Sequence, residues 1–120
     1  MDGDDNKTDF EALERACEAD RRSGRYSELA RNARARGRYD EDASYTSRSN
    51  EAFREANDKM IVADPELRAE NKALEDAQRA MYDGPGDHSL EERVWVAIKK
   101  VFLREKAEET VRKRCNPPVA

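Results

Sequence analysis

One histidine, two cysteines and an arginine-rich segment are the residues that could support chemistry in this 120-residue chain. His88 stands between Asp87 and Ser89 in a turn rich in glycine and proline. Neighbouring residues rarely form a working nucleophile and base, and Ser89 is better explained as the cap of the helix that follows it. The paired carboxylates along the chain are typical of solvated helix surfaces. The sequence therefore predicts no catalytic residue and no enzyme activity.

The potential metal ligands are too few and too scattered to form a site. Cys17 and Cys115 lie near opposite ends of the chain, and no short Cys-x-x-Cys or His-x-x-x-His spacing occurs. A structural zinc site needs four such ligands. The sequence also contains no glycine-rich loop that could bind the phosphates of a nucleotide cofactor. We therefore expect no metal and no cofactor. The N-terminus does not resemble a secretion signal, so the sequence predicts a cytoplasmic protein whose two thiols are reduced.

Arginine is concentrated in residues 21–38, which hold one acid and no lysine. A guanidinium pairs in a bidentate manner with phosphate or carboxylate groups. Three interpretations stay open for this segment: contact with nucleic acid, contact with an acidic patch on another protein, or internal pairing with the acidic segments on either side. The arginines are Arg21, Arg22, Arg25, Arg31, Arg34, Arg36 and Arg38.

The supply of large apolar side chains limits how stable an isolated subunit can be. Leu, Ile, Val and Phe together number 17 of 120 residues, and charged residues make up 42% of the chain. Each such side chain stabilises the fold by about 1.5–3 kcal/mol when it is fully buried. A chain with so few of them is marginal as a monomer. The composition therefore favours association with a second copy or with another macromolecule.

Helix signals dominate the chain, and no segment has the alternation of a strand. Capping boxes at Thr8–Glu11 and Ser89–Glu92 and an N-cap with a following proline at Asp64–Pro65 predict helix starts. Gly24 and Gly37 are expected to end the first two helices. These signals predict an all-α fold, a compact bundle of about five helices with the long C-terminal helix at its centre. We expect one domain over residues 1–120, with a disordered N-terminus at 1–7, a polar loop at 39–48, a Gly/Pro loop at 83–88 and a tail at 116–120.

The C-terminal helix is apolar around most of its circumference. A broad face running from Leu90 to Phe102 is expected to be buried, and Val96 and Leu103 form a second stripe on the other side. Either the helix is surrounded within its own subunit, or the second stripe meets another copy or a partner. Because the rest of the chain offers few large side chains, the second interpretation is favoured. The expected dimer or partner interface is formed by Trp95, Val96, Phe102 and Leu103.

These features together predict a non-catalytic protein that binds another protein as a regulator, an adaptor or an inhibitor. An inhibitor of the kind found in phages and mobile elements would fit its small size and acidic charge. The predicted partners are a second copy of the chain and a protein of unknown identity, and the sequence contains no candidate transmembrane helix. The alternative is a nucleic-acid-binding protein that uses the arginines of 21–38.

Overall fold

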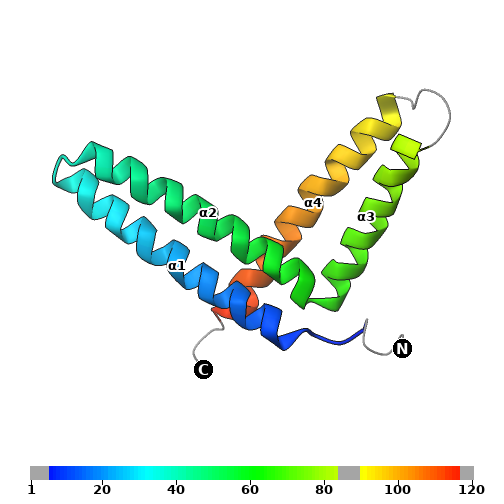
Figure 1. The fold of residues 1–120 in the computed structure, drawn as a ribbon, viewed down its shortest axis with the longest axis horizontal. Helices are drawn as coiled ribbons and strands as arrows, with labels where there is room; N and C mark the ends of the chain where they lie inside the picture. Colours follow the sequence, from blue (N-terminus) through cyan, green and yellow to red (C-terminus); the bar gives the residue numbers. More distant parts are fainter. Residues whose placement is uncertain (1–5, 84–89, 117–120) are drawn as a thin grey trace.

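Four helices form two antiparallel hairpins that diverge from a common corner (Figure 1). The computed structural model describes residues 6–83 and 90–116. The first hairpin consists of α1 (Phe10–Ala35) and α2 (Tyr39–Ala63), and the second of α3 (Pro65–Asp83) and α4 (Leu90–Cys115). The all-α class is confirmed, with four helices instead of about five. The termini beyond these ranges and the Gly/Pro segment with His88 lie outside the described residues.

The molecule is elongated, and the expectation of a compact bundle is wrong. Its radius of gyration is 18.0 Å, whereas a compact domain of this length would have a value of about 14 Å. The distal half of the α1–α2 hairpin extends away from α3 and α4 as a two-helix arm (Figure 1). Helix α4 contacts each of the other three helices, but so does α2, so α4 is not the single central helix that was expected. The elongation leaves much of the surface of α4 without a neighbour.

Helix α1 continues through Gly24, where the sequence predicted an end. Glycine costs about 1 kcal/mol relative to alanine inside a helix, and packing against α2 on both sides of Gly24 offsets this cost. The buried residues of α1 are Ala12, Ala16, Ala19, Ser23, Ala30 and Ala33. Such small side chains allow the two helix backbones to approach closely. The helix ends instead before Gly37, whose φ of 73° suits a glycine at a helix C-terminus.

Residues 39–48 are helical, so the prediction of a polar loop there is wrong. The Thr46 hydroxyl donates to the Asp42 carboxylate of the same helix, and the hydroxyl of Ser49, just after this range, forms hydrogen bonds across the hairpin. The Ser23 hydroxyl donates to the backbone carbonyl of Ser49 at 3.1 Å, and the Ser49 hydroxyl donates to the carbonyl of Ser23 at 2.9 Å. The rings of Tyr26 and Tyr45 stack with their centroids 6.3 Å apart. Reciprocal polar contacts thus stabilise a part of the hairpin that has few large apolar side chains.

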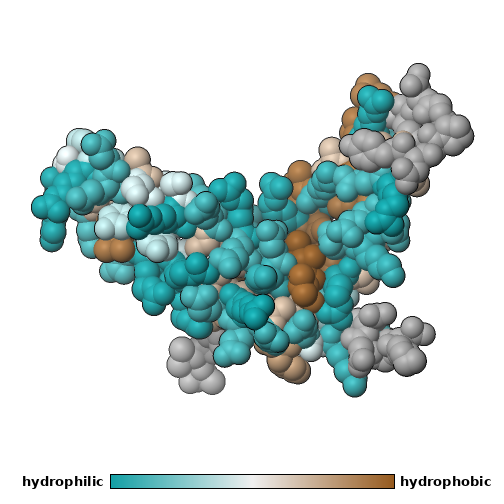
Figure 2. Space-filling model, in the orientation of Figure 1, coloured by the Kyte–Doolittle hydropathy of each residue, from teal (hydrophilic) through white to brown (hydrophobic). Residues whose placement is uncertain are grey.

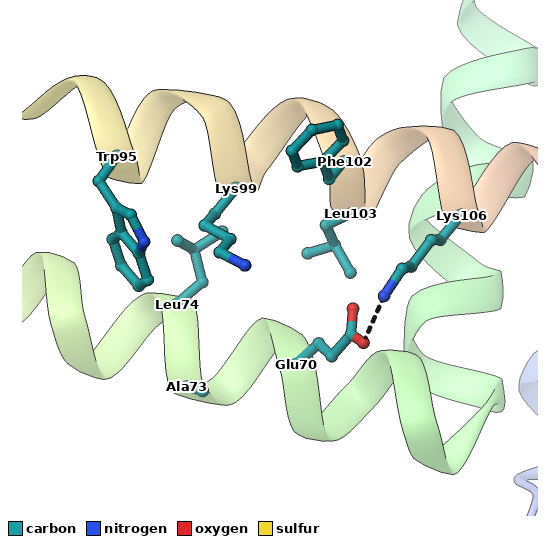
Figure 3. A pocket seen from close by; sticks show the side chains of 8 residues that line it. All are labelled: Glu70, Ala73, Leu74, Trp95, Lys99, Phe102, Leu103 and Lys106. Atoms are coloured by element: carbon teal, nitrogen blue, oxygen red, sulfur yellow. Dashed lines mark hydrogen bonds and ion pairs between the residues drawn. The ribbon is translucent and has the colours of Figure 1, made fainter.

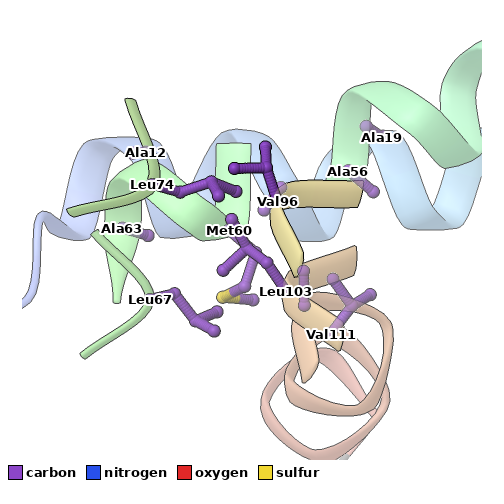
Figure 4. Packing of buried hydrophobic residues seen from close by; sticks show 12 residues of the cluster. Ala12, Ala19, Ala56, Met60, Ala63, Leu67, Leu74, Val96, Leu103 and Val111 are labelled. Carbon is purple, nitrogen blue, oxygen red and sulfur yellow. The ribbon is translucent and has the colours of Figure 1, made fainter. Parts of the chain in front are cut away.

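The corner between the hairpins holds most of the hydrophobic core. Met60 is the largest side chain that is fully buried among the described residues, and Figure 4 shows it beside Leu67 and Leu103. Asp64 caps α3, as predicted, by accepting a hydrogen bond from the Leu67 amide at 3.0 Å. Its other carboxylate oxygen lies 3.3 Å from the Arg114 guanidinium of α4. The corner therefore joins α2, α3 and the end of α4.

A disulfide between Cys17 and Cys115 ties the end of α4 to α1. The expectation of two reduced thiols is therefore wrong. No local pattern indicates this pair, because 98 positions separate the two cysteines and only the folded corner brings them together. Disulfides form and persist mainly in oxidising environments. Because disulfides are rare in the cytoplasm, this bond does not support the predicted cytoplasmic localisation, which stays a prediction.

Candidate functional site

Helix α4 has two opposite apolar faces. The face expected to be buried in the core is exposed, and the face expected to meet a partner is buried. The narrow stripe, predicted to meet a second copy or a partner, packs inside the subunit: Val96 and Leu103 are each 7% exposed. Ala107 and Val111 continue this stripe toward Cys115 and are also buried. Placing Val96 and Leu103 in an intermolecular interface is therefore wrong. The signal in the sequence that could have identified the buried face is the length of the stripe. It extends over four turns, whereas the broad face stops at Phe102.

The broad face of α4, which we expected to be core, is exposed to solvent. Trp95 and Phe102, two of the predicted interface residues, are each 52% exposed. Figure 2 shows apolar surface gathered over α4 in the angle between the two hairpins. Apolar patches larger than a few hundred Å² are rare on monomeric proteins and usually mark interaction sites. This surface, called the α4 outer face below, comprises Leu90, Val94, Trp95, Ile98, Val101 and Phe102.

A groove runs along the border between α3 and the α4 outer face. Its first hollow, of about 350 Å³, lies between Ala73 and Leu74 of α3 and the two aromatic residues of α4. Figure 3 shows the Trp95 indole and the Leu103 side chain extending from α4 toward α3. At one end of this hollow the Lys106 ammonium lies 2.7 Å from the Glu70 carboxylate. The hollow is thus apolar at its base, and its edge carries Lys99, Lys106 and Glu70, with an excess of one positive charge.

The second hollow of the groove lies on the other side of Trp95. It has a volume of about 550 Å³ and is lined on α3 by Ala77, Ala80 and Met81. On α4 it is bordered by Glu91 and Glu92, so its edge is anionic. In the first hollow, the Lys99 ammonium lies 5.7 Å from the centroid of the Trp95 ring, within the range of a cation–π contact. Trp95 therefore separates two apolar hollows whose edges have opposite charge.

The arginines of 21–38 are divided between internal pairs and solvent. Arg22 contacts Glu55 of α2 at 2.7 Å and Glu18 at 3.1 Å. The Arg34 guanidinium contacts Asp42 at 2.9 Å, and this hydrogen bond lowers the pKa of the Asp42 carboxyl below its usual value. Internal pairing thus accounts for part of the segment, together with a longer contact at 3.7 Å between Arg38 and Glu41.

The remaining arginines do not form one continuous basic surface. Arg21, Arg25, Arg31 and Arg36 are exposed. At 100° per residue, Arg21, Arg25 and Arg36, which directly follows α1, lie on one side of the helix, and Arg31 lies about a third of a turn from Arg25. Glu14 and Glu28 are on the same side as the first three. These two acids weaken the attraction for a phosphate backbone.

A third hollow lies between the hairpins and contains a buried polar group. Asn57 of α2 is 5% exposed, and its Oδ1 atom has no hydrogen-bond partner in the structure. Phe53 and Leu103 border the same hollow, and so do side chains of both charges such as Arg54 and Glu108. This mixed lining does not select one chemical class of ligand. We therefore base no functional argument on the hollow.

Other classes of site are not indicated by the part of the chain that the structure describes. Over residues 6–83 and 90–116, no group of three or more His, Cys, Asp or Glu residues is arranged to hold a metal ion. Within the same ranges, no helix combines the length and the apolar character needed to cross a membrane. Comparison of the chain with protein-family models, with curated proteins and with solved structures gave no match. The α4 outer face and its groove are the surface features of the described residues that best fit a binding site.

Proposed function

We propose that this chain is a non-catalytic binding protein that engages a macromolecular partner, most simply another protein, through the α4 outer face. The observation that carries the proposal is the exposure of six large apolar side chains on one helix, in a chain that has few of them. Removing such side chains from water is the main driving force of protein association. Trp95 and Phe102 supply the aromatic area that dominates the energetics of most interfaces.

A nucleic-acid-binding role for the arginines has less support. Three of the seven arginines contact acids of α1 or α2, and Glu28 lies among the others along α1. Proteins that bind nucleic acid without reading sequence generally present a basic patch or stripe on one face. The protein-binding role accounts for the exposed apolar side chains of the α4 outer face, which are a more unusual feature of the surface than the exposed arginines. Whether it is exercised as a regulator, an adaptor or an inhibitor depends on the partner.

We expect Ile98→Asp to abolish most of the partner binding and to leave the fold intact. Ile98 lies in the middle of the α4 outer face and is 47% exposed, so the free protein tolerates a charge there. In a complex the same carboxylate would be desolvated without a partner of its own. The partner is captured with the wild-type chain, identified, produced alone and titrated by calorimetry. Affinity should fall at least about 30-fold, the size of a typical hot-spot effect.

Val62→Asp is the matched control for this experiment. Val62 lies on α2, outside the α4 outer face, and is also 47% exposed. It should change affinity less than about twofold, because surface substitutions away from an interface have small effects. Equal affinities of the wild type and Ile98→Asp for the purified partner would contradict the proposal. Light scattering of the chain alone tests the predicted homodimer, since a monomer has a mass of 13.8 kDa.

A further inference from the structure

The α3–α4 hairpin resembles one half of a four-helix bundle. Its two helices pack against each other beyond the corner (Figure 1), and over the described residues the α4 outer face stays about half exposed. A helical hairpin can bury such a face by packing against a second hairpin. We propose that a second copy of the chain covers the α4 outer face, with the two α4 helices antiparallel around a two-fold axis. This inference rests on the proposed function and names one occupant of the same surface, for which any other partner would have to compete.

Two charged and two aromatic residues form a line along the exposed side of α4. At 100° per residue, all four lie within about 60° of one another around the helix. Their order is acid, aromatic, aromatic, base, and the acid and the base are each four positions from the nearer aromatic residue. All four are exposed. This line, called the α4 seam below, comprises Glu91, Trp95, Phe102 and Lys106.

An antiparallel second copy complements the α4 seam along its length. When Trp95 lies opposite Phe102 of the second copy, Glu91 lies opposite Lys106, because both pairs of numbers have the same midpoint. The two-fold axis repeats each contact, so the pairing forms two ion pairs and two aromatic contacts. A parallel pairing in register would instead put Glu91 opposite Glu91 and Lys106 opposite Lys106, and such like charges are unfavourable.

The symmetry of the α4 seam selects a second copy over an unrelated helix. A two-fold interface brings the same patch of both subunits together, so the patch must complement itself. An unrelated partner imposes no such condition on the order of charges along one helix. Glu92 and Glu105 have the same midpoint as the seam. They lie about 140° apart around α4, on opposite sides of the seam, and therefore do not face each other in the dimer.

The apolar area is sufficient for a small stable dimer. The six large side chains of the α4 outer face are each about half exposed or more, which leaves roughly 100 Å² of each in water. Covering them on two copies buries roughly 1,200 Å² in total, the lower end of the range for specific interfaces. Ala73 and Ala80 are exposed where α3 borders the groove, and their small side chains allow a close approach of helices. We therefore expect a dissociation constant on the order of 10 μM.

Exchanging the charges of the α4 seam tests the antiparallel register. Glu91→Lys puts two lysines opposite each other, and Lys106→Glu puts two glutamates opposite each other. Each variant alone should dimerise about tenfold more weakly than the wild type. A mixture of the two variants should form a heterodimer with about the wild-type affinity, because each lysine then faces a glutamate. This rescue cannot come from the contact between Lys106 and Glu70, which lies within one chain.

The affinities are measured by analytical ultracentrifugation of the full chain under oxidising conditions, with a fluorescent label on one variant to detect the heterodimer. Phe102→Ala removes an exposed aromatic side chain of the seam and should weaken the dimer at least about 30-fold. Glu14→Lys is the matched control, since it makes the same charge change at an exposed position of α1, outside the α4 outer face. It should change the dissociation constant less than about twofold.

Three results would overturn this inference. A wild type that remains a 13.8 kDa monomer up to about 1 mM excludes the dimer. Single charge variants that dimerise as tightly as the wild type exclude the α4 seam, and a mixture that associates no more tightly than its components excludes the antiparallel register. A monomeric wild type, together with loss of a purified partner in Ile98→Asp, would reject the second copy and keep the proposed function. If neither self-association nor partner binding responds to Ile98→Asp, the proposed function is rejected as well.

Discussion

Reduction of the Cys17–Cys115 disulfide is expected to lower the free energy of unfolding by about 4 kcal/mol. The bond closes a loop across a sequence separation of 98 residues. A crosslink of this length restricts the unfolded chain strongly, and loop-closure estimates give about 4.7 kcal/mol for 100 residues. Strain and residual structure usually reduce that value. The loss is large for a small protein, whose total stability is normally about 5–15 kcal/mol.

Urea unfolding followed by circular dichroism, with and without a reductant, measures this effect. The double variant Cys17→Ser/Cys115→Ser is the control, since it should resemble the reduced wild type and be indifferent to the reductant. Thiol titration of the unreduced native protein should find no free cysteine. Two titratable thiols in that protein, or an unfolding midpoint that the reductant does not change, would contradict the arrangement of the corner. The expected difference far exceeds the error of linear extrapolation, which is about 10–15%.

Met60→Ala is expected to lower the free energy of unfolding by about 3 kcal/mol. Met60 is completely buried at the corner, where α2 meets α3 and α4. Truncating a buried methionine removes its transfer free energy and leaves a cavity, at a cost of about 2–5 kcal/mol. The loss should be near the middle of this range because the small neighbours Ala56 and Ala63 have no side-chain freedom to fill the space. The packing of the two hairpins against each other depends on this side chain.

The variant Met60→Leu tests whether the stability depends on the volume that the side chain fills or on the particular shape of methionine. A swap of similar volume typically costs less than about 1.5 kcal/mol, so the leucine variant should retain at least half of the stability that the alanine variant loses. Both variants are unfolded in urea under oxidising conditions, so that the disulfide is the same in each. Equal stabilities of the wild type and Met60→Ala would show that Met60 is not packed as the corner requires.

The sequence predicted helices well where their signals are local. The start of α3 followed from Asp64 and Pro65, and the turn after α1 followed from Gly37, because both signals act through the backbone of a few residues. The errors at Gly24 and at residues 39–48 have one cause. Near Gly24 the Ser23 hydroxyl bonds to Ser49, and within 39–48 the Tyr45 ring stacks on Tyr26. In both cases the partner lies on the opposite helix, where local propensity cannot detect it. The disulfide was missed for the same reason.

The site was predicted in part. The sequence indicated that α4 has two apolar faces and that Trp95 and Phe102 matter for binding, but it assigned the wider face to the core. A wider apolar face is usually the buried one. Here the alanine-rich helix α3 lies along the first half of α4 and leaves the broad face uncovered, while the narrow strip with Val96 and Leu103 is buried. The groove could not be predicted, since it depends on the placement of α3 beside α4.

The central claim is that the α4 outer face is uncovered in the isolated chain and is covered by a partner. Acrylamide quenching of Trp95 tests it directly, because no other tryptophan contributes to the emission. For a preparation that light scattering shows to be the 13.8 kDa monomer, we expect red-shifted emission and efficient quenching. Addition of the purified partner should shift the emission to the blue and protect the indole. Blue-shifted emission that acrylamide barely quenches, in the monomer alone, would contradict the claim.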